Sequence, residues 1–175
     1  MSGHSRWSQI KHKKEIEDLK RGQLFSKLAK KISIAARSGS DPAINFKLQS
    51  AIEEAHSFNL PKENIERAIK RASDKTTAAL DQIVIQAIGP GAVAIVIEAI
   101  TDNRNRTISE VKNILVNGGA KMVPEGSLNW MFSKNWTPLT PVELNDPIVR
   151  QKLERLFEEL DDHADVEEVY TNLKM

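Results

Sequence analysis

The residues best suited to chemistry lie together near the beginning of the chain. Residues 3–14 read GHSRWSQIKHKK and combine histidine, tryptophan and cationic side chains without a single acidic residue. The cations could contact phosphates in a strongly salt-dependent way, and Trp7 offers a flat face on which a base could stack. His4 and His12 could hydrogen-bond to a base or to a backbone oxygen. The alternative is a solvated basic tail with Trp7 packed against neighbouring helices.

A second candidate is the stretch TDNRNRT, residues 101–107, which falls between an expected strand and an expected helix. Asp and Asn favour tight turns, and the spacing of Thr107 and Glu110 predicts a capping box at the helix start. Turn chemistry leaves Arg104 and Arg106 unexplained. Two guanidinium groups beside a helix N-terminus could bind an anion, so a structural and a functional interpretation both stay open.

Two charged stretches are more typical of solvated surfaces than of sites. In residues 62–72, Lys62, Glu66 and Lys70 follow one another at four-residue steps, which indicates ion pairs along a helix face. A basic wall that continues the opening stretch is the alternative. Near the C-terminus, acidic residues gather between Glu158 and Glu168, and we expect a solvated helix end there rather than a site for a divalent ion.

The sequence contains no constellation that indicates catalysis. His56 with Glu53 makes neither a metal site nor a catalytic triad. There is no His-x-x-x-His, no glycine-rich phosphate loop followed by Lys-Ser or Lys-Thr, and no GxSxG. We therefore expect a protein that is not an enzyme and that has no cofactor, no bound metal and no small-molecule substrate.

Charge is distributed unevenly over the 175 residues. Residues 1–80 contain 16 Lys and Arg against 9 Asp and Glu, whereas residues 81–175 contain 9 against 15. This asymmetry favours a polyanionic partner for the first half. With no cysteine and no apolar run long enough for a membrane span, we expect a cytoplasmic protein with neither disulfides nor contact with a membrane.

Three helices are expected before residue 80. Apolar residues recur with helical spacing from Leu24 and stop near Gly39. Asp41 followed by Pro42 predicts the start of a second helix, with Ile44 on its apolar face. Pro61 predicts the start of a third helix. Short connections between them indicate a small bundle.

The pattern after residue 80 favours strands. Two β-branched runs flank Gly89-Pro90-Gly91, which is typical of a hairpin, and a helix follows that stops before Gly118. Further elements are expected as a strand over 127–132, a helix over 148–160 and a strand over 166–172. The fold class predicted is α+β: an N-terminal three-helix domain over residues 1–79, followed by a mainly antiparallel α+β sheet domain over residues 80–175.

The chain resembles the YebC/PmpR family, which includes the mitochondrial translational activator of cytochrome c oxidase. The resemblance rests on GHSRW, IKHKK, KRGQLFSKL, NLPKENIERAIKRA, GPGAVAI, TDNRNRT, GSLNWMF and DVEEVYTN. It implies a helical domain followed by two α+β domains, the third inserted into the second. Here the chain runs from Phe132 almost directly into TPLTPVEL, so we expect the inserted domain to be missing near residues 134–137.

The resemblance also implies a function in gene expression without catalysis. Most bacterial members are described as DNA-binding transcriptional regulators at promoters, and this is the leading prediction. The alternative is a ribosome-associated translation factor that binds ribosomal RNA and relieves stalling on proline-rich stretches. An extended basic arm with an aromatic residue suits irregular RNA at least as well as a duplex. The predicted nucleic-acid-binding residues are His4, Arg6, Trp7, Lys11, His12, Lys13, Lys14, Arg21, Arg104 and Arg106.

Overall fold

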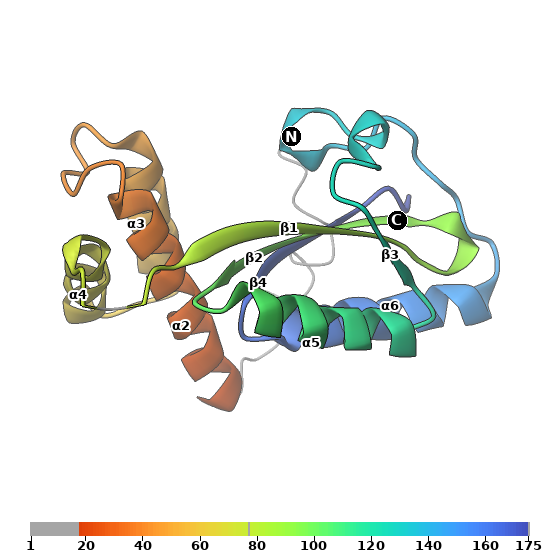
Figure 1. Ribbon diagram of the computed structural model, residues 1–175, viewed down its shortest axis with the longest axis horizontal. Helices are drawn as coiled ribbons and strands as arrows, with labels where there is room; N and C mark the ends of the chain where they lie inside the picture. Colours follow the sequence, from red (N-terminus) through yellow and green to blue (C-terminus); the bar gives the residue numbers. More distant parts are fainter. Residues whose placement is uncertain (1–17, 77, 175) are drawn as a thin grey trace. The chain divides into compact units, whose positions relative to one another are not determined.

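The computed structural model describes residues 18–76 and 78–174, which form two compact units (Figure 1). The helical unit comprises residues 18–82 with 100–102, and the sheet unit comprises residues 83–99 with 103–174. The elements are α2 (Asp18–Ala36), α3 (Phe46–Ser57), α4 (Lys62–Ser73), β1 (Asp81–Ile88), η1 (Pro90–Ala92), β2 (Ala94–Thr101), α5 (Arg104–Asn117), β3 (Lys121–Val123), η2 (Asn129–Met131), η3 (Lys134–Trp136), α6 (Pro147–Asp162) and β4 (Val166–Thr171). None of the helices in the described ranges has the length and apolar character needed to cross a membrane.

The helical unit is built around the apolar stripe of α2. Leu28, Ile32 and Ala36 are buried on one side of this helix, at the spacing that brings residues of successive turns onto one face. Helix α2 packs against both α3 and α4, which contribute Leu48, Ala51, Ala55, Ile65 and Ala68 to a shared core. The three predicted helices are confirmed.

The start of α3 differs from the prediction. The helix begins at Phe46 instead of Pro42, and its N-cap is Asn45, whose side-chain oxygen accepts the Leu48 N–H at 3.1 Å. The same Asn45 amide donates to the carbonyl oxygens of residues 35 and 39, at 2.8 and 2.7 Å. The Asn45 side chain both caps α3 and ties it to the end of α2. The helix therefore starts after Asn45 and not at Pro42, where the sequence predicted it. Ile44, expected on the apolar face, is 83% exposed.

The sheet has the strand order β3-β1-β2-β4. Strand β3 pairs antiparallel with β1, and β4 pairs antiparallel with β2. The turn between β1 and β2 is closed by a hydrogen bond of 2.8 Å from the Gly89 N–H to the Val93 carbonyl. Gly91 has a φ of 71° in this turn, a conformation that favours glycine, and a Cβ there would lie 2.5 Å from Leu144 Cδ2, which would have to shift. The predicted hairpin and the α+β class are confirmed.

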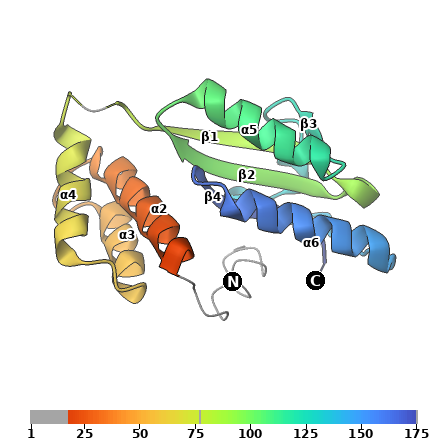
Figure 2. The same cartoon turned by 90° about the horizontal axis from the view of Figure 1, so that it is seen from below.

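Helices α5 and α6 lie side by side over one face of the sheet (Figures 1 and 2). Alternate residues of β1 and β2, among them Ile85 and Ile97, point into this layer and meet Leu115, Leu153 and Phe157. The capping-box prediction at the start of α5 is wrong. Asn103 is the N-cap, because its side chain accepts the N–H of residue 106 at 3.1 Å, and Thr107 lies inside the helix.

The opposite face of the sheet is covered by the segment from residue 124 to 140 (Figure 1). The strand predicted over 127–132 is wrong, since the segment forms the short helix η2, and the strand that pairs with β1 is β3. Gln86 of β1, only 1% exposed, explains the difference. Its side-chain oxygen accepts the Leu128 N–H at 2.9 Å and its nitrogen donates to Asn129 Oδ1 at 2.8 Å. The first of these bonds occupies a backbone N–H that a strand would need.

Residues 133–137 form a tight turn at the point where the inserted domain was expected to be missing. Phe132 and Pro138 form an antiparallel bridge, and the Ser133 N–H donates to the Thr137 carbonyl at 2.8 Å. Trp136 folds back onto the sheet, where its indole N–H donates to Glu98 Oε1 at 2.8 Å. The two ends of the turn therefore lie next to each other.

Candidate nucleic-acid interface

The predicted site residues divide into two groups. His4, Arg6, Trp7, Lys11, His12, Lys13 and Lys14 lie outside the described residues, so the prediction for the opening arm stays a prediction. The other three lie within the described ranges and are not gathered in one place along the chain. Arg21 is exposed on α2, while Arg104 and Arg106 lie in the first turn of α5.

Several cations of the helical unit are exposed and have no ion-pair partner within the described part of the chain. Among them are Arg21, Arg37, Arg67, Arg71 and Lys75. Others are neutralised locally: Lys31 Nζ lies 2.6 Å from Glu54 Oε2, and Lys62 Nζ lies 3.6 Å from Glu66 Oε1. The expected four-residue pairing along α4 therefore accounts for Lys62 and Glu66 and leaves the C-terminal half of the helix basic.

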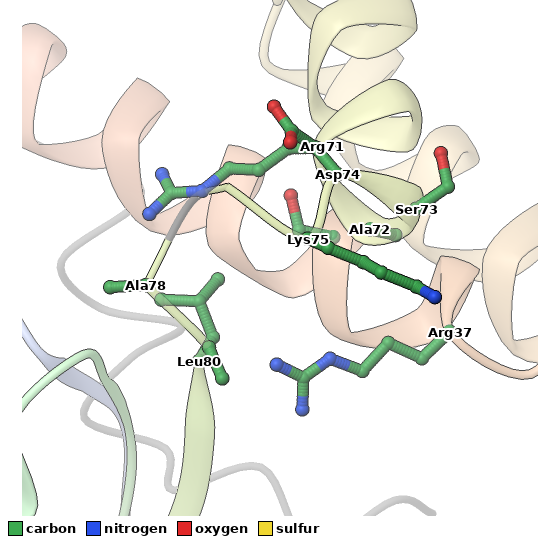
Figure 3. A pocket seen from close by; sticks show the side chains of 10 residues that line it. Arg37, Arg71, Ala72, Ser73, Asp74, Lys75, Ala78 and Leu80 are labelled. Carbon is green, nitrogen blue, oxygen red and sulfur yellow. The ribbon is translucent and has the colours of Figure 1, made fainter.

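Three of these unpaired cations line a hollow in the helical unit (Figure 3). Arg37 follows the end of α2, Arg71 lies in the last turn of α4, and Lys75 lies in the segment after α4. Small side chains such as Ala72 and Ala78 form much of the rest of the wall. The volume of this cationic hollow is about 470 Å³.

Asp74 is the one acidic residue on the wall of the cationic hollow. Its carboxylate accepts the Thr76 hydroxyl at 2.6 Å and the Thr76 N–H at 2.8 Å. These hydrogen bonds lower the pKa of Asp74, the hydroxyl having the larger effect. Asp74 therefore stays ionised and is used to fix the turn after α4, while the wall keeps an excess of positive charge.

The two arginines of TDNRNRT have different surroundings. Arg106 Nη2 lies 2.8 Å from Asp165 Oδ2, and the exposed fractions of the two side chains are 43% and 6%. Thr107 Oγ1 donates to the same Asp165 oxygen at 2.7 Å. Arg104 is more exposed, with its Nη2 3.9 Å from Glu125 Oε2. The structure thus gives Arg106 a structural partner and leaves Arg104 at the surface.

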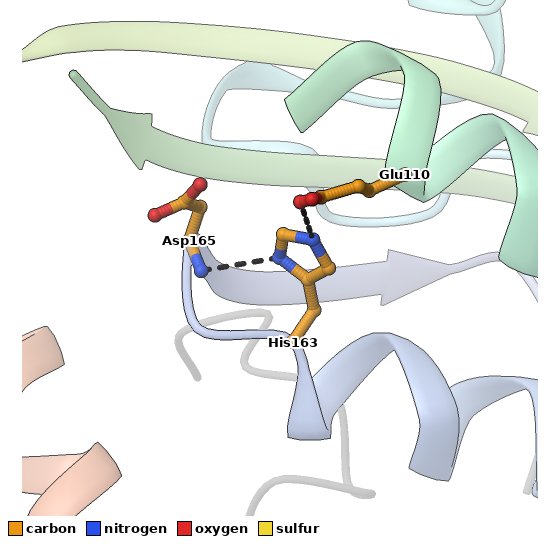
Figure 4. Close-up of side chains that lie close together, drawn as sticks. All are labelled: Glu110, His163 and Asp165. Atoms are coloured by element: carbon orange, nitrogen blue, oxygen red, sulfur yellow. Dashed lines mark hydrogen bonds and ion pairs between the residues drawn. The ribbon is translucent and has the colours of Figure 1, made fainter. Parts of the chain in front are cut away.

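His163 extends this network to a third side chain (Figure 4). Its Nδ1 accepts the Asp165 N–H at 3.1 Å, and its Nε2 lies 2.9 Å from Glu110 Oε2. Because Nδ1 is an acceptor, the proton of the neutral ring must be on Nε2, which donates to Glu110. The network connects the beginning of α5 with the turn between α6 and β4.

The donor set of this network could also be considered for a metal ion. Glu110, His163 and Asp165 each offer one atom, all within 4.8 Å of one another. However, Asp165 Oδ2 already accepts from Thr107 and from the Arg106 guanidinium, and the Glu110 carboxylate already accepts from His163. A cation would have to displace these donors and lie beside a fixed positive charge. The residues fit a neutralised structural network better than a metal site.

Sequence reasoning missed two of these features. Asp165 belongs to the acidic stretch that was expected to be a solvated helix end, but it is buried, and its partner Arg106 is 59 positions away in the sequence. No local spacing signals such a pair. The cationic hollow had a weaker signal, namely basic residues at or near the ends of two predicted helices.

Sequence profiles of known domains match most of the chain. A profile described as the TACO1/YebC protein N-terminal domain matches residues 5–75. A profile described as the TACO1/YebC second and third domain matches residues 80–135. The first match covers residues 5–14 of the opening arm and the described helices of the helical unit, and the second ends at the tight turn of residues 133–137.

Similar proteins are longer than this chain. A "Probable transcriptional regulatory protein" of Trichlorobacter lovleyi is 43% identical over 174 residues, which cover 98% of this chain and 70% of that protein. One from Caldanaerobacter subterraneus is 46% identical and is covered to 63%, and one from Chloroflexus aurantiacus is 51% identical and is covered to 54%. The chain thus spans between about half and 70% of these relatives.

A solved structure shares the fold. The crystal structure of a conserved hypothetical protein, Aq1575 from Aquifex aeolicus, matches with a TM-score of 0.88 and 30% sequence identity, and the match covers 97% of each chain.

Proposed function

Since the chain belongs to the TACO1/YebC family, we propose that it is a nucleic-acid-binding regulator of gene expression without catalytic activity. The observation that supports this most is the set of exposed, unpaired cations in the helical unit, three of which surround one hollow. Cations without carboxylate partners are available to phosphates and release counterions on contact. The relatives, moreover, are named as regulatory proteins.

In this proposal the basic opening arm and the helical unit bind together. Lys11, Lys13 and Lys14 supply phosphate contacts, and Trp7 supplies a stacking surface. The sheet unit contributes little to binding, because residues 81–175 carry more acidic than basic residues. A low density of cations on that side would keep the nucleic acid on the helical unit.

Control of transcription through promoter DNA is the form of regulation that the names of the relatives favour. RNA, including ribosomal RNA, is a second candidate that one structural observation favours. The unpaired Arg37, Arg71 and Lys75 lie at helix C-termini and in a loop, whereas a major-groove reader usually presents the N-terminal part of a recognition helix. Cations placed this way suit an irregular or single-stranded backbone.

The arm can be tested with the variant Lys11→Ala/Lys13→Ala/Lys14→Ala. Affinity for labelled DNA and RNA, measured by fluorescence anisotropy at several salt concentrations, should fall for every sequence. The slope of log K against log salt should decrease by roughly 0.9 per lost duplex contact or roughly 0.7 per lost single-strand contact. The matched control is Lys112→Ala/Lys152→Ala/Arg155→Ala, which removes three exposed cations from α5 and α6. An unchanged slope in the arm variant would contradict the proposal.

The choice between DNA and RNA needs a separate experiment. The protein is purified from mildly crosslinked cells, and the nucleic acid that accompanies it is sequenced. Enrichment of promoter fragments favours transcriptional control, and enrichment of ribosomal RNA favours a role at the ribosome. Recovery of neither above the level found with the arm variant would count against both.

A further inference from the structure

We propose that the cationic hollow is a second contact site for nucleic acid, one that holds the phosphate-sugar backbone and does not read bases. This inference rests on the proposed function, and it adds a site separate from the opening arm. It assigns Arg37, Arg71 and Lys75 the role of phosphate ligands.

The first argument is charge. Three cations, one from the end of each of two helices and one from the following segment, surround the hollow, and a single carboxylate opposes them. That carboxylate, Asp74, is engaged by Thr76, and Figure 3 shows it at the opposite side of the view from the Arg37 guanidinium. A guanidinium group can donate two parallel hydrogen bonds to the oxygens of one phosphate, so arginine suits such a site better than lysine does.

Positions at helix C-termini offer a second interpretation of the two arginines. Cations there interact favourably with the partial negative charge of the helix end. This effect leaves the guanidinium accessible to solvent. It explains why arginine is tolerated at Arg37 and Arg71, but it does not neutralise them, and it does not involve Lys75.

The second argument is shape. Ser33, buried in α2, donates its hydroxyl to the Ala68 carbonyl of α4 at 2.8 Å, which fixes the two helices behind the hollow. Between the three cations the wall consists largely of alanines and serines, so a nucleic-acid backbone can approach it closely. A volume of about 470 Å³ lies within the roughly 300–1,000 Å³ of small-ligand pockets, which is enough for a phosphate with its sugar.

The third argument concerns what the wall lacks. None of its ten lining residues is aromatic, so the hollow lacks the aromatic side chains on which bases usually stack. Apart from the Asp74 carboxylate, its polar groups are cations and hydroxyls, which form contacts to phosphate and sugar, and such contacts carry no sequence information. The site should therefore raise the affinity for all sequences equally, and any sequence preference must come from elsewhere in the protein.

The test is the full-length variant Arg37→Ala/Arg71→Ala/Lys75→Ala, titrated by anisotropy against fluorescein-labelled single-stranded RNA and duplex DNA, each in two unrelated sequences. For each kind of nucleic acid, the affinities for its two sequences should fall by the same factor. Each lost duplex contact should cost roughly eightfold at about 0.1 M salt, the counterion-release effect of a slope of about 0.9. The variant Arg37→Lys/Arg71→Lys keeps the charge and should keep most of the affinity.

The controls separate the possible failures. The sheet-unit variant Lys112→Ala/Lys152→Ala/Arg155→Ala should bind as the intact protein does, and circular dichroism should show that all variants are folded. If the arm variant loses affinity but the hollow variant binds like the intact protein, the hollow is not a site and the proposed function stands. A loss equal to that of the sheet-unit variant, or a loss limited to one sequence, also overturns the inference. If the intact protein binds neither probe, the proposed function fails and this site fails with it.

Discussion

Arg104 and Arg106 show how little of a residue's role follows from its type and its place in a motif. Both are arginines in the first turn of α5, two positions apart. Arg106 contacts a carboxylate that is almost fully buried, whereas Arg104 lies at the surface near another exposed side chain. Burial of the partner therefore decides which of the two stabilises the fold.

Their stability effects should differ accordingly. Arg106→Ala leaves the buried Asp165 with fewer donors and should lower the free energy of unfolding by about 1–2 kcal/mol, after allowance for the partial exposure of Arg106. Arg104→Ala should change it by less than about 0.5 kcal/mol, as is usual for exposed ion pairs. Urea denaturation of the two variants measures both values. Equal effects would show that the Asp165 contact does not contribute in the way that its geometry indicates.

At the scale of elements, Gln86 holds the segment after β3 on the sheet. Replacing it in Gln86→Leu leaves the buried Leu128 N–H without its acceptor and should destabilise the protein by about 1–3 kcal/mol. Hydrogen exchange at Leu128 should become faster than at Leu115 in α5. The control Gln151→Leu, at an exposed position of α6, should stay within about 0.5 kcal/mol of the original protein. An unaltered exchange rate at Leu128 would contradict this role of Gln86.

The elements that the sequence predicts correctly are those that local signals specify. The apolar spacing from Leu24 identifies α2, and Gly118 correctly indicates the end of α5. The wrong predictions concern segments whose local structure depends on a residue far away in the sequence. Residues 127–132 look like a strand, but Gln86, some 42 positions earlier, binds Leu128 and turns the segment into a short helix. Asn45 likewise moves the start of α3 because it reaches back to the end of α2.

The candidate site follows the same rule. A basic opening arm can be predicted from composition alone, since charge and aromatic content need no tertiary structure. The hollow could not be predicted, because it forms only when the ends of α2 and α4 come together. The topology of the sheet unit brings Arg106 and Asp165 together. The residue spacing within either segment does not predict this pair.

At the scale of the whole molecule, the tight turn of residues 133–137 is the place where a longer relative could carry an inserted domain. The profile match ends at residue 135, within this turn, and the absence of an inserted domain at this point stays a proposal. The bridge between Phe132 and Pro138 places the two ends of the turn together. An insert could then leave and re-enter the sheet unit without moving a strand.

A flexible glycine-serine segment placed between Lys134 and Asn135 tests this geometry. Lengthening the turn about fourfold should cost only about 1 kcal/mol, because each doubling of a loop costs about 0.6 kcal/mol. The same segment placed between Val96 and Ile97, both fully buried in β2, should prevent folding. Thermal denaturation compares the two. A loss of folding in the first variant would mean that the turn is an essential part of the sheet unit.

Because of the contact between Trp136 and Glu98, intrinsic tryptophan fluorescence can report on the structure of the sheet unit. The three tryptophans are Trp7, Trp130 and Trp136, and residues 18–82 contain none. Trp136 lies against the sheet with its indole hydrogen-bonded, while Trp130 is 68% exposed. Intrinsic fluorescence therefore distinguishes a shielded indole from a solvated one within the sheet unit, and it is silent for α2, α3 and α4. The remaining emission belongs to the opening arm, where stacking on a nucleobase would quench it.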